Sequence, residues 1–187
     1  TKYIGGHGDV VAGVIVGAEN FMKEIKRTVH KDMGGIMSPV DAWLLIRGLK
    51  TLHVRMDRHC ENANKVYSQE TTDPKVKSTY FPGDTEHEDH EIVKKQMKKG
   101  GGLISFEIDG TKQDAQNFLD NVRLIKLAVS LGDTESLIQH PASMTHAGIP
   151  LENRLEMGIT DQLIRLSVGI EAWEDIWEDL EQALNRI

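Results

Sequence analysis

The sequence predicts an α/β protein in which the end of a larger α/β domain is followed by a small α+β domain. The run Val10–Val16 is apolar on both alternating faces, as in a strand buried between helix layers. Downstream, short strand-like and helix-like segments alternate, and apolar residues recur at helical spacing over the last stretch, 173–187. We place the boundary near Gly48, which assigns residues 1–48 to the first domain and 49–187 to the second.

A helix is predicted directly after the apolar run, because Phe21, Met22, Ile25 and Val29 recur at helical spacing. A strand followed by an amphipathic helix is half of a βαβ unit. We therefore expect the other strands of this domain to lie upstream of Thr1.

A second helix is predicted to start at Ser38–Asp41, where a serine N-cap, a proline at the first helical position and an acidic residue follow one another. From Leu52 an apolar stripe continues through Val66. This stripe predicts a long connecting helix that leads out of the first domain.

The second domain is predicted to mix short strands with helices. The expected strands are 76–80, 103–108 and 163–168, and the expected helices are 114–122 and 173–187. The polar stretch from Ser68 to Lys77 is predicted to be a surface loop.

The composition argues against a nucleic acid or an anionic membrane as a partner. The formal net charge is -7, whereas either partner would need a concentrated basic surface. No segment approaches the roughly 18 apolar residues of a membrane helix. The single cysteine, Cys60, cannot form an internal disulfide, which fits a reducing cytoplasm. We expect a cytoplasmic protein that acts on a small substrate.

The N-terminal stretch places Thr1 and Lys2 ahead of several glycines and the predicted strand. A lysine in front of a buried strand can be desolvated, which lowers its pKa and makes its amine a nucleophile toward an aldehyde. A terminal lysine is, by itself, more often a solvated charge. These residues alone leave both interpretations of Lys2 open.

Several motifs follow one another over nearly the whole chain: Thr1–Tyr3 with Gly6–Gly13, Ser130–Gly132, Glu135–Ile138, His140–His146, Gly158–Asp161 and Leu163–Gly169. In this order they resemble the cystathionine/methionine-metabolism family of fold-type-I pyridoxal-phosphate enzymes. The resemblance implies that the chain holds the end of the large cofactor-binding domain and the C-terminal domain. It also implies that Lys2 binds pyridoxal 5'-phosphate covalently and acts as general base, while Thr1 helps to hold the phosphate.

The resemblance further assigns the substrate carboxylate to Arg165, with Ser130 assisting. An arginine in such a strand-like run is otherwise most often part of a surface ion pair. At a strand end, however, its planar guanidinium suits a bidentate bond to an amino-acid carboxylate.

Substrate choice is predicted from fewer residues. Relatives that bind cystathionine usually carry an acidic residue directly before the serine equivalent to Ser130, whereas this chain has Val129. A valine cannot pair with an ammonium group but can line a pocket for a thioether methyl, which favours methionine. Lys31 and Asp32 also resemble substrate-site residues of the methionine-cleaving members, although a solvated helix-end pair explains them equally well.

The resemblance therefore implies γ-elimination of L-methionine to methanethiol, 2-oxobutyrate and ammonia. The alternatives within the family are a cystathionine γ-lyase or synthase and an O-acetylhomoserine sulfhydrylase. A non-catalytic interaction module is a further alternative, but it would need none of Thr1, Lys2, Ser130 and Arg165. We expect these 187 residues to be inactive alone, because the family's ring-stacking tyrosine, its aspartate for the ring nitrogen and its phosphate loop lie upstream.

The resemblance also implies a homo-oligomer, expected to be a tetramer, because family active sites draw residues from two subunits. Trp43, Trp173 and Trp177 are candidate contact residues. The cluster His87–His90 would place two imidazoles on one face if it were helical. It follows a Pro-Gly pair in a polar stretch, and no third histidine or cysteine is nearby, so we predict no metal site.

Overall fold

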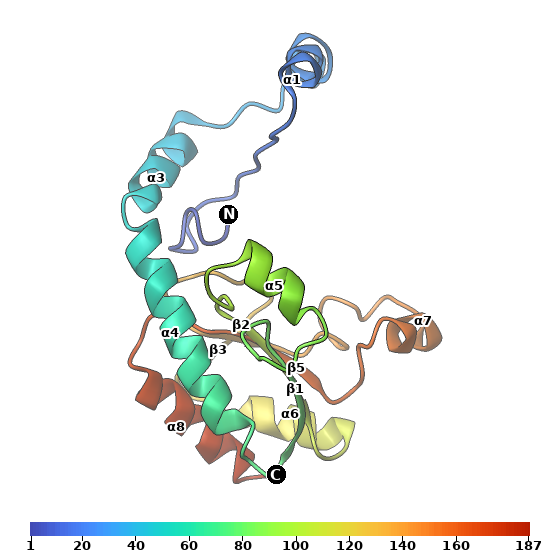
Figure 1. The fold of residues 1–187 in the computed structure, drawn as a ribbon. Coiled ribbons are helices and arrows are strands. Elements are labelled where there is room, and N and C mark those ends of the chain that lie inside the picture. The colour runs from blue at the N-terminus through green and yellow to red at the C-terminus, as the bar shows by residue number, and fades with distance from the viewer.

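Two consecutive helices, α3 (Pro39–Leu49) and α4 (Leu52–Glu70), link the two parts of the molecule in the computed structural model, which describes all 187 residues (Figure 1). The N-terminal elements are α1 (Glu19–Ile25), the π-helical stretch η1 (Lys26–His30) and α2 (Lys31–Met33). Figure 1 shows α1 at the end of the molecule farthest from the sheet. The helix predicted after the apolar run is confirmed.

The predicted strand at Val10–Val16 is not formed, so this prediction was wrong. Only Val10 in this run is buried, whereas Val11 and Val16 are 84% and 86% exposed. A strand forms only where a neighbouring strand can pair with its backbone groups. The described residues offer the segment no such neighbour, because the only sheet lies in the C-terminal part.

The predicted start of α3 is confirmed. Ser38 is the N-cap and its hydroxyl oxygen accepts from the Asp41 backbone N–H at 3.1 Å, while Pro39 takes the first helical position. The connecting helix is also confirmed as α4. It continues to Glu70, and the first strand begins at Val76, so the predicted surface loop is shorter than expected. The reason is tertiary, because Glu70 is buried against the sheet and accepts a hydrogen bond there.

A five-stranded sheet with the order β1-β2-β5-β4-β3 forms the C-terminal part. Its strands are β1 (Val76–Tyr80), β2 (Leu103–Ile108), β3 (Lys126–Leu127), β4 (Leu137–Gln139) and β5 (Leu163–Ser167). All neighbours are antiparallel except β3 and β4, which pair parallel. The three predicted strands correspond to β1, β2 and β5. β3 and β4 were not predicted, because two or three residues are too short to show a period.

The core lies between this sheet and the helices α4, α6 (Lys112–Asn121) and α8 (Trp173–Leu184). The two predicted helices of this domain are confirmed as α6 and α8. Ile104 and Phe106 of β2, like Ile164 and Leu166 of β5, belong to the buried cluster. Because side chains alternate along a strand, the residues between them project from the opposite face of the sheet.

Ser105 of β2 and Arg165 of β5 are such residues and are paired in register. Trp177 packs against the core, while Trp43 on α3 is exposed. Two short helices were not predicted: α5 (His90–Gln96) and α7 (Leu151–Glu156). No helix is both long enough and apolar enough to span a bilayer, and no three His, Cys, Asp or Glu residues are grouped to hold a metal ion.

Candidate active site

Residues far apart in the sequence meet at the predicted lysine. Lys2 Nζ donates to Ser130 Oγ at 3.1 Å, although 128 positions separate the two residues. Arg165 Nη2 donates to the carbonyl oxygens of Val129 and Ser130, at 3.0 and 2.9 Å. The structure therefore brings four of the predicted site residues together.

The loop that carries Ser130 is docked on both the strand of Arg165 and the lysine segment. The Gly132 backbone N–H donates to Ser167 Oγ, two residues after Arg165, at 2.9 Å. Gly132 has φ +72, and a Cβ on it would lie 2.8 Å from the backbone nitrogen of Tyr3. Only glycine allows this approach, because an L side chain would be strained at that φ and would crowd Tyr3.

Arg165 keeps hydrogen-bond donors free for a ligand. Its Nε is buried without a hydrogen-bond partner, and burial lowers the pKa of its guanidinium. A buried, unpaired donor on a cationic group costs free energy unless a ligand supplies an acceptor. Nη2 is occupied by two carbonyls and Nη1 makes no hydrogen bond, so Nη1 is the donor open to a carboxylate, which fits the predicted role.

Lys2 presents an accessible amine. Its side chain is exposed and its amine makes one hydrogen bond, to Ser130, so the nitrogen remains accessible. Thr1 is more constrained, because its hydroxyl donates to the Ala12 carbonyl at 2.8 Å and accepts from the Ala12 N–H at 2.7 Å. To donate to a phosphate, Thr1 would have to give up the bond to the Ala12 carbonyl.

Of the remaining predicted residues, Val129 lies beside Ser130, whereas Lys31 and Asp32 make no polar contact with the Lys2 site. Val129 is 52% exposed beside Ser130, so its side chain is open to whatever binds there. Lys31 and Asp32 are exposed on α2 and make no hydrogen bond or ion pair with Lys2, Ser130 or Arg165. The structure does not bring this pair to Lys2 of the same chain.

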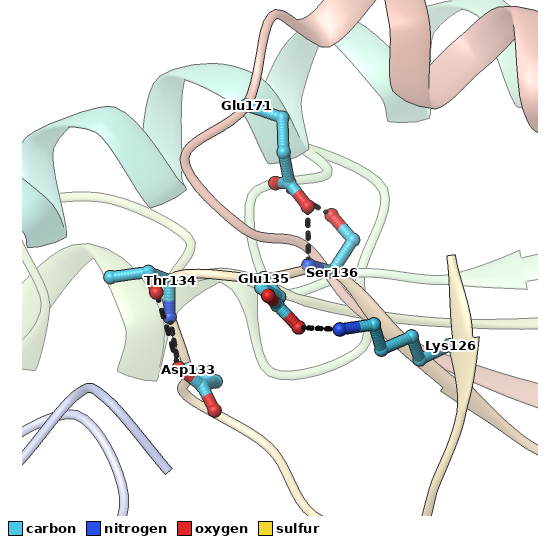
Figure 2. Close-up of polar contacts among 6 residues, drawn as sticks. All are labelled: Lys126, Asp133, Thr134, Glu135, Ser136 and Glu171. Atoms are coloured by element: carbon cyan, nitrogen blue, oxygen red, sulfur yellow. Dashed lines mark hydrogen bonds and ion pairs between the residues drawn. The ribbon is translucent and has the colours of Figure 1, made fainter. Parts of the chain in front are cut away.

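The segment between Ser130 and β4 is held by residues that the sequence reasoning missed (Figure 2). Glu171 accepts from the Ser136 backbone N–H at 2.6 Å and from Ser136 Oγ at 3.0 Å. Lys126 pairs with Glu135, and the Asp133 carboxylate accepts from the Thr134 backbone N–H. The Glu171 bonds tie the segment to the residues that follow β5, and the Lys126 pair ties it to β3. A single glutamate in the sequence gives no sign of such a role.

Arg55, His59 and Asn62 on α4 were also missed. All three side chains are buried, although their residue types usually lie at the surface. Their spacing places them on one helix face. This shared face could have indicated from the sequence that the three polar side chains are buried. It was missed because the apolar stripe alone was used to assign the buried face of α4.

The family model described as "Cys/Met metabolism PLP-dependent enzyme" matches residues 1–185. The chain belongs to this family. The match confirms the family predicted from the ordered motifs and, with it, pyridoxal 5'-phosphate as the family's cofactor. The accessible amine of Lys2, which lies beside Ser130 and Arg165, is consistent with a cofactor that carries an aldehyde.

Individual relatives carry several names. The chain is 52% identical over 188 residues to the L-methionine gamma-lyase of Fusobacterium nucleatum subsp. polymorphum. It is 50% identical over 187 residues to the cystathionine gamma-lyase of Bacillus subtilis (strain 168), and 48% identical over 185 residues to the cystathionine beta-lyase of Coxiella burnetii. These alignments cover 98–100% of this chain and 48–49% of the relatives, so the chain spans about half the length of the curated relatives it matches.

Solved structures confirm the predicted fold class. The cystathionine gamma-lyase from Lactobacillus plantarum complexed with L-serine matches with a TM-score of 0.93 and 43% identity, over 100% of this chain and 49% of that chain. The cystathionine gamma synthase from Xanthomonas oryzae pv. oryzae in complex with cystathionine matches with a TM-score of 0.93 and 42% identity, over 99% and 48%. The chain therefore has the architecture of about half of a fold-type-I pyridoxal-phosphate enzyme.

Proposed function

We propose that the full-length protein containing this chain is a pyridoxal-phosphate-dependent carbon–sulfur lyase that converts L-methionine to methanethiol, 2-oxobutyrate and ammonia. The observation that carries the proposal is the meeting of Lys2, Ser130 and Arg165 at hydrogen-bond distances. When bound, pyridoxal phosphate supplies an electron sink for the electrons left at Cα when its proton departs.

Arg165 orients the substrate in this proposal. Its Nη1, which makes no hydrogen bond, binds the carboxylate, while the carbonyls of Val129 and Ser130 hold Nη2 and prevent the guanidinium from turning. Fixing the carboxylate fixes the direction of the Cα–H bond, which is a positioning contribution to the rate.

Lys2 is the proposed general base. With its amine free, the Lys2 nitrogen lies 3.1 Å from Ser130 Oγ, so Ser130 holds it near the carboxylate end of the substrate. From this position it can remove the Cα proton and deliver it elsewhere on the same substrate. Ser130 and Arg165 thereby place the base and the substrate relative to each other.

Val129 supports methionine as the substrate. Its exposed, uncharged side chain next to Ser130 offers a thioether methyl an apolar neighbour and offers a distal ammonium no partner. The second candidate is a lyase, synthase or sulfhydrylase acting on cystathionine or O-acetylhomoserine. It is supported by the cystathionine lyases among the relatives of similar identity.

A homo-oligomer, which we propose to be a tetramer, accounts for the position of Lys31 and Asp32. Because α2 directly follows α1 and η1, and α1 lies at the end of the molecule farthest from the sheet (Figure 1), these residues would contribute to substrate binding in the site of a second copy. The exposed face around Trp43 is a candidate contact surface. Sedimentation of a fully active monomer would contradict this assembly.

The unpaired Cys60 is consistent with the cytoplasm as the proposed location.

The test is a product assay on the full-length protein. We expect methanethiol and 2-oxobutyrate from methionine, and an absorbance band of the lysine-bound cofactor that Lys2→Ala abolishes. Turnover of cystathionine without turnover of methionine would favour the second candidate. A wild-type protein without cofactor absorbance would instead indicate a non-catalytic module, and a Lys2→Ala variant that retains a borohydride-reducible link to the cofactor would refute the assignment of Lys2.

A further inference from the structure

Arg55 on α4 is a buried cation that binds the backbone turn carrying Lys2. It is 4% exposed. Its Nη1 donates to the Tyr3 carbonyl at 2.8 Å, its Nη2 to the Gly48 carbonyl at 2.8 Å and its Nε to Thr51 Oγ1 at 3.1 Å. One guanidinium thus joins the residue after Lys2, the end of α3 and the start of α4.

The packing around Arg55 leaves this turn little space. The turn is closed by the Gly6 N–H, which donates to the Lys2 carbonyl at 2.7 Å. Gly6 has φ +69, and a Cβ on it would overlap Arg55 Nη1. On the α3 side of the turn, a Cβ on Gly48 would lie 2.5 Å from the carbonyl oxygens of Ile4 and Gly5. The backbone of Lys2 is therefore confined by α3 and by Arg55 together.

The same face of α4 also reaches the strand of Arg165. His59, one helical turn after Arg55, packs edge-on against Tyr3 with 5.1 Å between the ring centroids. The His59 Nδ1 lies 2.7 Å from the Val168 carbonyl, which can only accept, so we assign the ring proton to Nδ1. Arg55 and His59 thus connect the lysine turn to the end of the strand that carries Arg165.

Burying the Arg55 guanidinium costs desolvation free energy, so packing alone does not explain why an arginine occupies this position. Burial lowers the pKa of its guanidinium, with the charge of Asp133 as the opposing influence, and no carboxylate is hydrogen-bonded to it. An apolar side chain would avoid the cost of desolvating a cation. The three hydrogen bonds that offset this cost all end on groups around the Lys2 turn.

We propose that Arg55 is a positioning residue, which holds the backbone of Lys2 at a fixed place relative to Ser130 and Arg165. The inference rests on the proposed function, in which Lys2 binds the cofactor and moves the Cα proton. A reacting group displaced by about 1 Å can lose about a hundredfold in rate, so a residue that touches no substrate can still control turnover.

The test replaces Arg55 with lysine in the full-length protein. Arg55→Lys keeps the charge, but one ammonium group cannot reach the two carbonyls and the Thr51 hydroxyl together. We expect kcat to fall on the order of tenfold while KM changes less than about twofold. Apoprotein of the variant should also regain the absorbance of the lysine-bound cofactor roughly tenfold more slowly than wild type, a readout that does not depend on turnover.

Arg154 provides a matched control. It is also a buried arginine, with Nη1 on the Ile159 carbonyl and Nη2 on Asp161 Oδ1, both at 2.8 Å, but it lies on α7. Arg154→Lys should lower stability and leave both kcat and cofactor reloading unchanged. Thr51→Val removes only one acceptor of Arg55, so it should lower kcat and the rate of cofactor reloading by about threefold each. If Arg55→Lys does not fold, Thr51→Val serves as the test of the inference.

Wild-type rates of reloading and turnover in Arg55→Lys, or in Thr51→Val if the first variant does not fold, would overturn the inference and leave the proposed function intact. Equal slowing by Arg154→Lys would overturn it too, because the effect would then be one of general stability. A wild-type protein that never gains the cofactor absorbance would refute the proposed function itself, and the inference with it.

Discussion

Replacing Val129 with glutamate should shift substrate preference from methionine toward cystathionine. The backbone of Val129 is anchored, because its carbonyl accepts from Arg165 Nη2 at 3.0 Å. Its side chain is 52% exposed, so a longer residue can replace it without disturbing the core. The substitution therefore changes mainly the charge beside Ser130.

The size of the shift follows from what each substrate presents to the new carboxylate. Methionine presents a thioether methyl, which leaves the charge unpaired or raises the pKa of the carboxyl. Cystathionine presents an ammonium group that can pair with it. Because position 129 is half exposed, water screens much of this difference. We expect a differential of about 1.4 kcal/mol, which corresponds to about a tenfold fall in the ratio of kcat/KM for methionine to that for cystathionine.

The assay measures kcat/KM for both substrates in full-length Val129→Glu and Val129→Gln. Glutamine has the same length without the charge, so Val129→Gln should leave the ratio within about threefold of wild type. An active Val129→Glu variant with an unchanged ratio would show that Val129 does not set specificity. The preference for methionine would then lose its main support.

Three further substitutions test other parts of the structure. Arg165→Lys should lower kcat/KM for methionine and cystathionine alike, by about tenfold or more, because their carboxylate is common; a selective loss for one substrate would contradict the assigned role. Burial raises the pKa of Glu70 from its ordinary value of 4.5 to about 8, so between these pH values the folded state holds a proton that the unfolded state releases. The stability that this proton provides is present at low pH and is lost as pH rises through about 8, with a slope of at most about 1.4 kcal/mol per pH unit. Chemical denaturation from pH 5 to 9 should show this slope in wild type and less of it in Glu70→Gln; identical slopes would refute it. Asp179 accepts the backbone N–H groups of residues 123–125 at 2.8–3.0 Å, so Asp179→Ala should lower the free energy of unfolding by about 1–3 kcal/mol, and an unchanged denaturation midpoint would exclude this role.

Secondary structure could be predicted from the sequence where residues close to one another along the chain determine it. The Ser38 cap, the first and second strands and the final helix depend on neighbouring residues, through capping geometry and apolar period. The run Val10–Val16 shows the limit of this approach. Its composition favours a strand, but strand formation requires a partner, and the described residues supply none.

The candidate site was predictable only in part, and for a different reason. Lys2, Ser130 and Arg165 were nominated because their motifs resemble those of a family, whereas nothing in their own spacing places them together. Arg55 and Glu171 were not nominated at all, because each looks like a surface charge in the sequence. Burial is a property of the packed chain, and for Arg55 the only sign of it in the sequence is a helix face shared with His59 and Asn62.

The sequence by itself determined which groups are present: an amine at Lys2, a guanidinium at Arg165 and an uncharged side chain at Val129. Only the tertiary structure decided that they can act together. The loop at Ser130 docks on β5, and Gly132 admits Tyr3 at close range, so residues 128 positions apart come to lie 3.1 Å from each other. The physical reason is that hydrogen bonds and steric fit between distant segments fix such distances, whereas local propensities act only over a few residues.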